Sequence, residues 1–190
     1  MPKPTLSTDI DGTLADSFNL WLKLANERYG LDMKASDIKT YDFWPTVGMT
    51  RKEFMDIWRE LWDYYPEIKP LPGVQETLGK LHKTYKVYVN AACIGDVSCI
   101  KAWFRENNIP HDRYNLVHGH WKKIKLVTDV HFEDAPPLAK QYASRGRNLV
   151  LISQPWNMSI HAELEKYSNV HVARNWKDAG RITLRQRFGR

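Results

Sequence analysis

Short runs of apolar, β-branched and aromatic residues recur along the chain, and each run predicts a β-strand. The first run leads directly into a turn at Gly12, which suits the end of a short buried strand. The predicted strands lie at residues 5–10, 85–92, 129–134, 148–154 and 169–173.

Helical patterns separate these strands, at residues 72–83, 96–108 and 135–146. In the first pattern Val74, Leu78 and Leu81 share one helix face. Asp96 is the expected N-cap of the second, and Gly146 is the expected stop of the third. Strands that alternate with helices predict an α/β fold with a mainly parallel sheet. In such sheets, reactive side chains gather at the carboxyl ends of the strands.

One segment, residues 18–70, breaks the alternation because it contains no convincing strand. It holds 11 of the 23 aromatic residues, and its stretch 51–65 is amphipathic at helical spacing. We therefore expect an α/β core made of residues 1–17 and 71–190, with residues 18–70 forming a small helical cap over its edge.

Composition narrows the class of protein. The 190 residues are 43% hydrophobic and 26% charged, which is typical of a folded globular chain. No apolar run approaches the roughly 18 residues of a membrane span. The N-terminus lacks the apolar stretch of a signal peptide, so we expect a cytoplasmic protein without membrane association. Cys93 and Cys99 are too few for a disulfide framework and fit no zinc motif.

The net charge is +6, which is compatible with anionic partners such as phosphorylated metabolites or nucleic acid. Much of the excess lies in residues 174–190, which contain six Lys or Arg and one Asp. Two interpretations of this tail stay open, a solvated terminal helix and a contact with a phosphate backbone.

Carboxylates cluster at two predicted strand ends. Asp9 and Asp11 alternate along the end of the first strand, which places them on one side, and Glu133 and Asp134 end another strand. Crowded carboxylates stay ionised only beside a cation, and Mg²⁺ prefers such oxygen ligands. Capping of the next helix is the alternative for the first pair, but it needs only one short polar side chain. A solvated turn is the alternative for the second pair.

The stretch DIDGTLADS at residues 9–17 resembles the D-x-D-G-T motif of the haloacid dehalogenase-like superfamily. Later pieces follow in that family's order, so the resemblance covers residues 5–156. It implies a Rossmann-like parallel sheet flanked by helices, with a helical C1 cap. Asp9 would be the nucleophile that becomes an aspartyl-phosphate, and Asp11 the general acid and base. The resemblance also implies Mg²⁺ held by the Asp9 carboxylate, the Asp11 main-chain carbonyl and Asp134, with Glu133 just behind them.

The same resemblance implies a lysine and a polar residue that contact the phosphate. Lys123 lies six residues before Asp129, the spacing seen in similar sequences, so we favour it over Lys122 and Lys125. Relatives usually have Thr or Ser at the end of the second strand, where this chain has Asn90. An amide still donates to a phosphate oxygen, so we expect Asn90 to bind the phosphate.

The predicted cap resembles that of the 5′(3′)-deoxyribonucleotidases, through its Phe-Trp pair, an Ile-Trp on the next helix and a Pro-Leu-Pro-Gly exit. This resemblance implies that Phe43, Trp44 and Trp58 sandwich a nucleobase, because every base offers a π-face for stacking. Phe54 and Trp62 are assigned to the interior of the cap.

These features predict a Mg²⁺-dependent phosphatase of nucleoside monophosphates. A phosphatase for another small phosphoester, or for nucleic-acid 3′ or 5′ ends, is the first alternative. A weakly catalytic nucleic-acid-binding protein is the second, and it depends on Asn90 and the C-terminal arginines. The segment 153–157 is expected at the rim of the site, and a homodimer stays open. Structural or surface roles are expected for three histidines, His118, His120 and His131.

Overall fold

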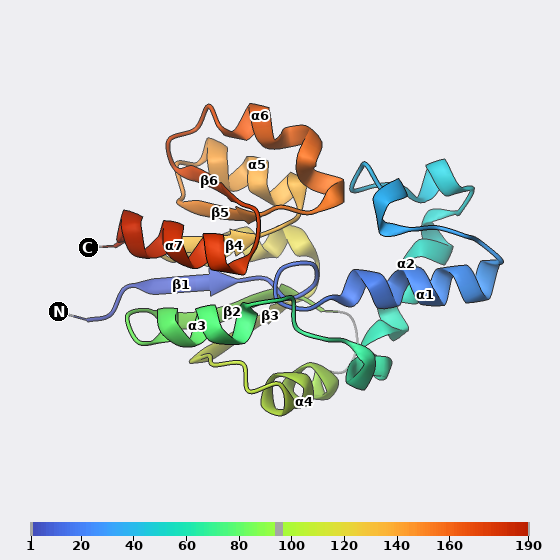
Figure 1. The fold of residues 1–190 in the computed structure, drawn as a ribbon, viewed down its shortest axis with the longest axis horizontal. Coiled ribbons are helices and arrows are strands. Elements are labelled where there is room, and N and C mark those ends of the chain that lie inside the picture. Colours follow the sequence, from blue (N-terminus) through green and yellow to red (C-terminus); the bar gives the residue numbers. More distant parts are fainter. Residues whose placement is uncertain (1, 94–96, 190) are drawn as a thin grey trace.

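The computed structural model describes residues 2–93 and 97–189. Its centre is a six-stranded parallel sheet in the order β3-β2-β1-β4-β5-β6, which confirms the predicted α/β fold (Figure 1). The strands are β1 Thr5–Thr8, β2 Lys86–Ala92, β3 Arg113–Val117, β4 Val130–Glu133, β5 Leu149–Ile152 and β6 Val170–Ala173.

Helices cover both faces of the sheet, and two hydrophobic clusters join the helices to it (Figure 1). One hydrophobic cluster joins the sheet to α3, α4 and α7, and a second joins it to α5 and α6. The α-helices are α1 Ser17–Tyr29, α2 Arg51–Glu60, α3 Val74–His82, α4 Ser98–Glu106, α5 Pro136–Ser144, α6 His161–Leu164 and α7 Trp176–Gln186. Short 3₁₀ helices are η1 Ala35–Asp37, η2 Trp44–Val47, η3 Leu61–Glu67, η4 His120–Lys125 and η5 Pro155–Ile160.

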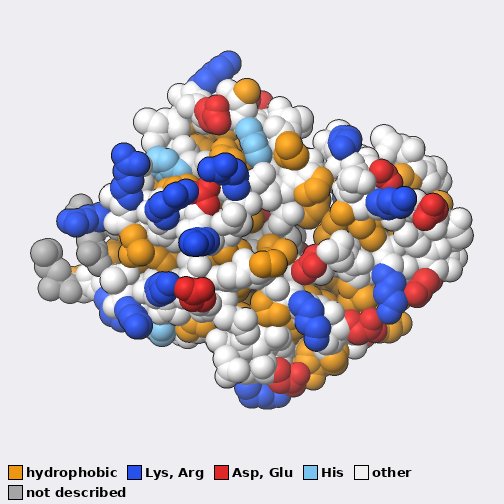
Figure 2. All heavy atoms as spheres, in the orientation of Figure 1, with side chains coloured by type: hydrophobic (Ala, Val, Ile, Leu, Met, Phe, Trp, Pro, Cys, Tyr) orange, Lys and Arg blue, Asp and Glu red, His pale blue; other side chains and the backbone are white. Residues whose placement is uncertain are grey.

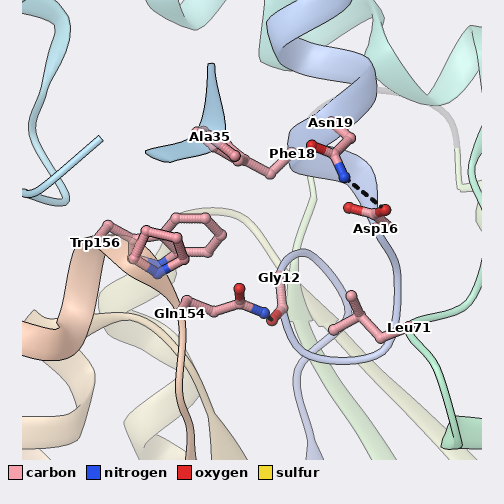
Figure 3. A pocket seen from close by; sticks show the side chains of 9 residues that line it. Gly12, Asp16, Phe18, Asn19, Ala35, Leu71, Gln154 and Trp156 are labelled. Carbon is pink, nitrogen blue, oxygen red and sulfur yellow. Dashed lines mark hydrogen bonds between the residues drawn. The ribbon is translucent and has the colours of Figure 1, made fainter. Parts of the chain in front are cut away.

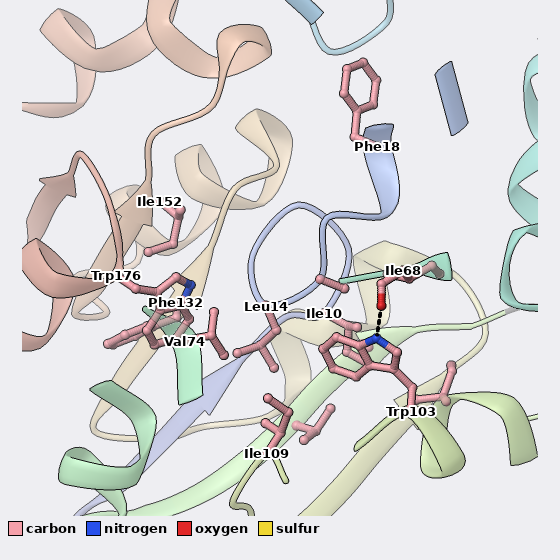
Figure 4. Close-up of a cluster of buried hydrophobic side chains, with 14 of the residues drawn as sticks. Ile10, Leu14, Phe18, Ile68, Val74, Trp103, Ile109, Phe132, Ile152 and Trp176 are labelled. Carbon is pink, nitrogen blue, oxygen red and sulfur yellow. Dashed lines mark hydrogen bonds between the residues drawn. The ribbon is translucent and has the colours of Figure 1, made fainter. Parts of the chain in front are cut away.

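The segment between β1 and α3 contains α1, α2 and the short helices η1 to η3, and it lies beyond the carboxyl ends of the strands (Figure 1). Hydrogen bonds join the chain that enters this segment to the chain that leaves it. The Asp16 amide donates to the Lys69 carbonyl at 2.8 Å, and the Leu71 amide donates to the Leu14 carbonyl at 2.8 Å. The indole of Trp103 on α4 adds a 2.8 Å hydrogen bond to the Ile68 carbonyl (Figure 4).

The structure differs from the sequence expectations at two places, the strand β3 and the C-terminal tail. β3 was not predicted, because its residues RYNLV lack a strong apolar pattern and lie at the edge of the sheet. The expected N-cap Asp96 lies outside the described residues. The C-terminal tail forms α7, but this helix is not simply solvated, since Trp176, Ala179 and Thr183 are buried. Within the described part of the chain, no helix has the length and apolar character needed to cross a membrane.

Candidate active site

A tight loop follows β1 and places the first acidic residues at the carboxyl edge of the sheet. The Asp9 amide donates to the Phe132 carbonyl on β4 at 3.0 Å, so Asp9 still belongs to the sheet. Immediately afterwards, the amides of Leu14 and Ala15 both donate to the Ile10 carbonyl at 2.8 Å. The backbone therefore turns back on itself directly after the strand and leaves the Asp9 carboxylate facing the adjacent end of β4.

Three buried carboxylates meet at this edge. Oxygens of Asp9, Glu133 and Asp134 all lie within 4.8 Å of one another. Asp9 follows β1, whereas Glu133 ends β4 and Asp134 follows it, so two neighbouring parallel strands supply the cluster. Acidic side chains this close repel one another unless cations lie between them.

Lys123 on η4 supplies one of these cations. Its Nζ lies 2.7 Å from Asp9 Oδ2 and 2.8 Å from Glu133 Oε2, and the side chain is buried. Burial alone would lower the pKa of the Lys123 ammonium, but the Asp9 and Glu133 carboxylates outweigh it and raise that pKa. Of the three lysines near this position, Lys123 is therefore the one that contacts the carboxylates.

Neutral donors hold the other carboxylate oxygens in place. Asp134 accepts hydrogen bonds from the Thr13 hydroxyl and the Trp156 indole, both at 2.9 Å. Glu133 Oε1 accepts from the backbone amides of Asp134 at 3.3 Å and of Ala135 at 3.2 Å. With Lys123 on its second oxygen, Glu133 is engaged at both ends, so Asp9 and Asp134 have more free lone pairs.

Gly12 is required for this close approach. Its φ is +70°, and a Cβ added there would lie 2.6 Å from Asp134 Oδ2 and 2.8 Å from Trp156 Cζ2. Both the left-handed backbone conformation and the lack of space exclude a side chain. The Gly12 carbonyl also accepts from Gln154 Nε2 at 2.6 Å, which ties the loop to the segment after β5 (Figure 3).

Asp11 lies on the same loop, at the surface of the cavity described below. Its Oδ1 atom is buried and has no hydrogen-bond partner among the described residues. Burial, and then the nearby Asp9 carboxylate, raise the pKa of Asp11 to about 7. Asp11 is therefore suited to exchange a proton near neutral pH.

The charge balance of the cluster fits a divalent cation. Three carboxylates face one ammonium group, and burial together with Asp9 raises the pKa values of Glu133 and Asp134. The available donors are oxygens only, which is the set that Mg²⁺ prefers. A bound dication would offset the excess negative charge.

A cavity of about 510 Å³ opens above the cluster, between the sheet edge and the segment that carries α1 and α2. Figure 2 shows a hollow between these two lobes with hydrophobic side chains along it. Phe43, Trp44 and Trp58 all line the cavity, as do Phe54 and Trp62, which were assigned to the interior of the cap. Of these five, Phe43 is the most enclosed, with edge-on contacts to the rings of Phe18, Trp21 and Phe54.

Asn90 does not line this cavity in the described structure. Its Nδ2 donates to the Lys123 carbonyl at 3.1 Å and lies 3.5 Å from the Tyr142 hydroxyl, while its Oδ1 accepts from Asn115 Nδ2 at 2.6 Å. Both the nitrogen and the oxygen of the Asn90 amide are therefore engaged in hydrogen bonds within the protein. The end of β2 instead presents Ala92 to the cavity, and alanine has no hydrogen-bonding group in its side chain.

Other cavity residues were not predicted from the sequence. Tyr41 reaches it from the loop before η2 and Arg51 from the first turn of α2, and no spacing pattern marks either residue. His120 also lines it, although a structural or surface role was expected. Trp156 lies within the segment 153–157 that was expected at the rim. A smaller cavity of about 100 Å³ adjoins this region and shares Gly12, Phe18 and Trp156 with the larger one (Figure 3).

Comparison with known proteins identifies relatives along almost the whole chain. Residues 3–188 match the family model described as 5′ nucleotidase, deoxy (pyrimidine), cytosolic type C protein. The chain is also 28% identical over 181 residues to a protein of Halalkalibacterium halodurans named "Putative nucleotidase BH1399", with 90% of each chain covered.

Solved structures share the fold at lower sequence identity. A haloacid dehalogenase-like family protein from Streptococcus pneumoniae matches with a TM-score of 0.60 at 14% identity, covering 93% of this chain and 96% of that one. The "putative HAD-hydrolase YfnB" from Bacillus subtilis, solved bound to magnesium, also matches with a TM-score of 0.60, at 12% identity, covering 96% of this chain and 99% of that one. These likenesses show a common fold.

Proposed function

This chain belongs to the family of cytosolic type C 5′ deoxynucleotidases, and from that membership we propose that it is a Mg²⁺-dependent phosphatase of nucleoside monophosphates, deoxyribonucleotides in particular. That it is a phosphoric monoester hydrolase with the haloacid dehalogenase-like fold is shown by the family match. The observation that best supports the finer proposal is the buried cluster of three carboxylates and Lys123 beneath an aromatic cavity.

In this proposal Asp9 is the nucleophile. One of its carboxylate oxygens attacks the phosphorus, an O–P bond forms, and the ester P–O bond breaks to give an aspartyl-phosphate. Asp11 donates its proton to the leaving oxygen, and then takes a proton from the water that hydrolyses the aspartyl-phosphate. The pKa of about 7 suits both halves of this cycle, because each protonation state is accessible near neutral pH.

The cation and Lys123 make this attack feasible by neutralising anionic charge. Asp9, Asp134 and the main-chain carbonyl of Asp11 would hold Mg²⁺. Glu133 would orient these ligands through its contacts with Lys123 and the Asp134 backbone amide. When bound, the ion supplies positive charge that lets a carboxylate approach a phosphate. Lys123 holds the Asp9 carboxylate in position and adds a further positive charge.

Asn90 takes a different role from the one expected from its position. Because its amide donates to the Lys123 carbonyl, we assign it to holding the η4 backbone rather than to binding the phosphate. Ala92, which lines the cavity at the end of β2, offers a phosphate only its main-chain groups.

The cavity aromatics would bind the nucleobase. We propose that residues 18–70 act as a cap over a core of residues 1–17 and 71–190, with Phe43, Trp44 and Trp58 offering ring surface to the base. A cavity of about 510 Å³ lies within the usual range for small-ligand sites. The family description supports a cytosolic location.

A panel of nucleoside 5′- and 3′-monophosphates, with small sugar phosphates for comparison, tests the proposal by phosphate release with and without Mg²⁺. We expect Mg²⁺-dependent release from nucleotides and little from sugar phosphates. Asp9→Asn should abolish turnover, whereas Asp32→Asn, a change of the same kind at an exposed loop position, should leave turnover intact. Release from sugar phosphates alone would refute the substrate class, and an active Asp9→Asn variant would refute the nucleophile.

A further inference from the structure

An exposed tryptophan stands at the mouth of the cavity. Trp121 on η4 is 53% exposed and lines the same cavity as Asp9 and Lys123, which are buried. An indole offers a large flat apolar surface with a hydrogen-bond donor at its edge, so a half-exposed ring at a cavity is suited to stack on a ligand.

The local backbone is built to hold this ring. Gly119 has a φ of +89°, and a Cβ added there would lie 3.1 Å from Trp121 Nε1. A side chain at position 119 would therefore press on the indole as well as strain the turn. The ring rests against the glycine backbone with much of its surface open to solvent.

Positive charge surrounds the ring. The ammonium groups of Lys122 and Lys125 lie 5.5 Å and 5.7 Å from its centroid. Arg51, on the opposite lobe, lines the mouth close enough to His120 for its charge to lower the pKa of that imidazole, after burial and Lys123. None of these three cations forms an ion pair with any carboxylate in the described parts of the chain.

The reacting phosphate does not need these outer cations. Lys123 and the acidic cluster lie in the interior, whereas Arg51 and the half-exposed Trp121 line the cavity and the two lysines lie beside the Trp121 ring. These groups suit a ligand that carries both a negative charge and a flat aromatic surface. A second nucleotide offers both, as a base that stacks and a phosphodiester that carries negative charge.

We propose that Trp121, with Lys122 and Lys125, forms a subsite for the second nucleotide of a phosphate-terminated single strand, so that the enzyme dephosphorylates the ends of short oligonucleotides. This inference rests on the proposed phosphatase function. The terminal phosphate occupies the interior, the first base lies in the aromatic cavity, and the next base stacks on Trp121.

Three substrates separate the contributions of charge and stacking. They are a deoxynucleoside monophosphate, the corresponding 3′,5′-bisphosphate, and a dinucleotide with a terminal phosphate, the last made with the phosphate at either end. We expect kcat/KM for the better dinucleotide to exceed that for the monophosphate by about tenfold, because a stacked base contributes on the order of 1–3 kcal/mol. The bisphosphate should fall between them. Added salt should reduce both preferences.

Substitutions then separate the contribution of the Trp121 ring from that of the two lysines. Trp121→Ala should reduce the ratio of dinucleotide to monophosphate kcat/KM to near that of the bisphosphate, whereas Lys122→Ala/Lys125→Ala should lower the ratios for both. Lys166→Ala/Tyr167→Ala removes an exposed lysine and aromatic at the opposite edge of the sheet, and should leave every ratio unchanged. The subsite proposal is wrong if the wild-type ratio of dinucleotide to monophosphate kcat/KM is one or less. It is also wrong if Trp121→Ala leaves that ratio unchanged.

Binding measurements keep this inference separate from the proposed reaction. Calorimetric titration of the Asp9→Asn variant should show tighter binding of the dinucleotide than of the monophosphate, and the added Trp121→Ala change should remove the difference. Hydrolysis of the monophosphate without preferential dinucleotide binding refutes the subsite alone. Preferential binding without hydrolysis of any substrate refutes the phosphatase proposal but supports the subsite.

Discussion

At the scale of single residues, the site holds acidic groups that are costly to ionise. Burial and Asp9 raise the pKa of Asp11 to about 7, while an Asp in an unfolded chain titrates near 3.8. Between these values the folded protein keeps a proton that the unfolded chain has released. The free energy of unfolding therefore falls as the pH rises from about 4 to about 7. Asp134 contributes in the same direction, since burial and Asp9 also raise its pKa.

Asp11→Asn should remove part of this pH dependence. In metal-free protein at pH 8, we expect the variant to be more stable than wild type by about 1–2 kcal/mol. This is less than the full pKa shift would give, because Asp11 is partly exposed to water in the cavity. Urea denaturation at pH 5, 6, 7 and 8 measures the effect, with Asp32→Asn as the control. Parallel pH profiles for wild type and Asp11→Asn would contradict the assignment.

The acidic residues at the strand ends could be predicted from the sequence, because two simple rules of sheet geometry both apply to them. Side chains alternate along a strand, and parallel strands end at the same edge, so Asp9 and the pair Glu133 and Asp134 could be brought together without coordinates. Asn90 also follows a strand pattern, but its expected phosphate contact depends on which way its amide points. That direction is set by the Lys123 carbonyl and by Asn115, which lie far away in sequence.

At the scale of elements, α3 and α7 come into contact at one tight point. A Cβ added to Gly180 on α7 would lie 2.5 Å from Thr77 Cγ2 on α3. Gly180 is buried within its helix and is not in a left-handed conformation, so the helix itself would accept alanine. Close packing of the two helices is therefore the reason for glycine at this position.

Gly180→Ala should destabilise the protein by about 1–3 kcal/mol through overpacking. Thr77→Ser deletes the opposing methyl group, so the double variant should recover much of that loss. Chemical denaturation of the wild type and the three variants forms a double-mutant cycle. Additive losses in the double variant would show that the cost arises elsewhere than at this contact.

The sequence analysis missed the strand β3 and the burial of one face of α7, because both depend on tertiary contacts. β3 is an edge strand with the mixed sequence RYNLV, and only pairing with β2 makes it a strand. The C-terminal tail is rich in Lys and Arg, but the buried Trp176 fixes α7 to the loop after β1 by donating to the Thr13 carbonyl at 2.6 Å. Neither contact has a local signature, because each joins residues that are distant along the chain.

At the scale of the whole molecule, charge is unevenly distributed. The chain carries a net charge of +6, and Lys and Arg side chains gather over α7 in the view of Figure 2. The buried centre at the sheet edge has the opposite sign, with three carboxylates against Lys123. The positive exterior attracts anionic substrates, whereas the negative centre destabilises the metal-free fold and provides a site for a cation.

Mg²⁺ should therefore stabilise the whole protein against unfolding. Since the cluster exists only in the folded state, a Mg²⁺ concentration 100 times the dissociation constant adds about 2.7 kcal/mol to the free energy of unfolding. Thermal denaturation across a Mg²⁺ series, at ionic strength matched with NaCl, should show a progressive rise in the midpoint. Asp134→Asn should abolish that rise, because it removes a carboxylate of the cluster, whereas Asp32→Asn should preserve it. An equal rise in both variants would place the binding of Mg²⁺ elsewhere on the molecule, and a rise reproduced by NaCl alone would reduce the effect to screening.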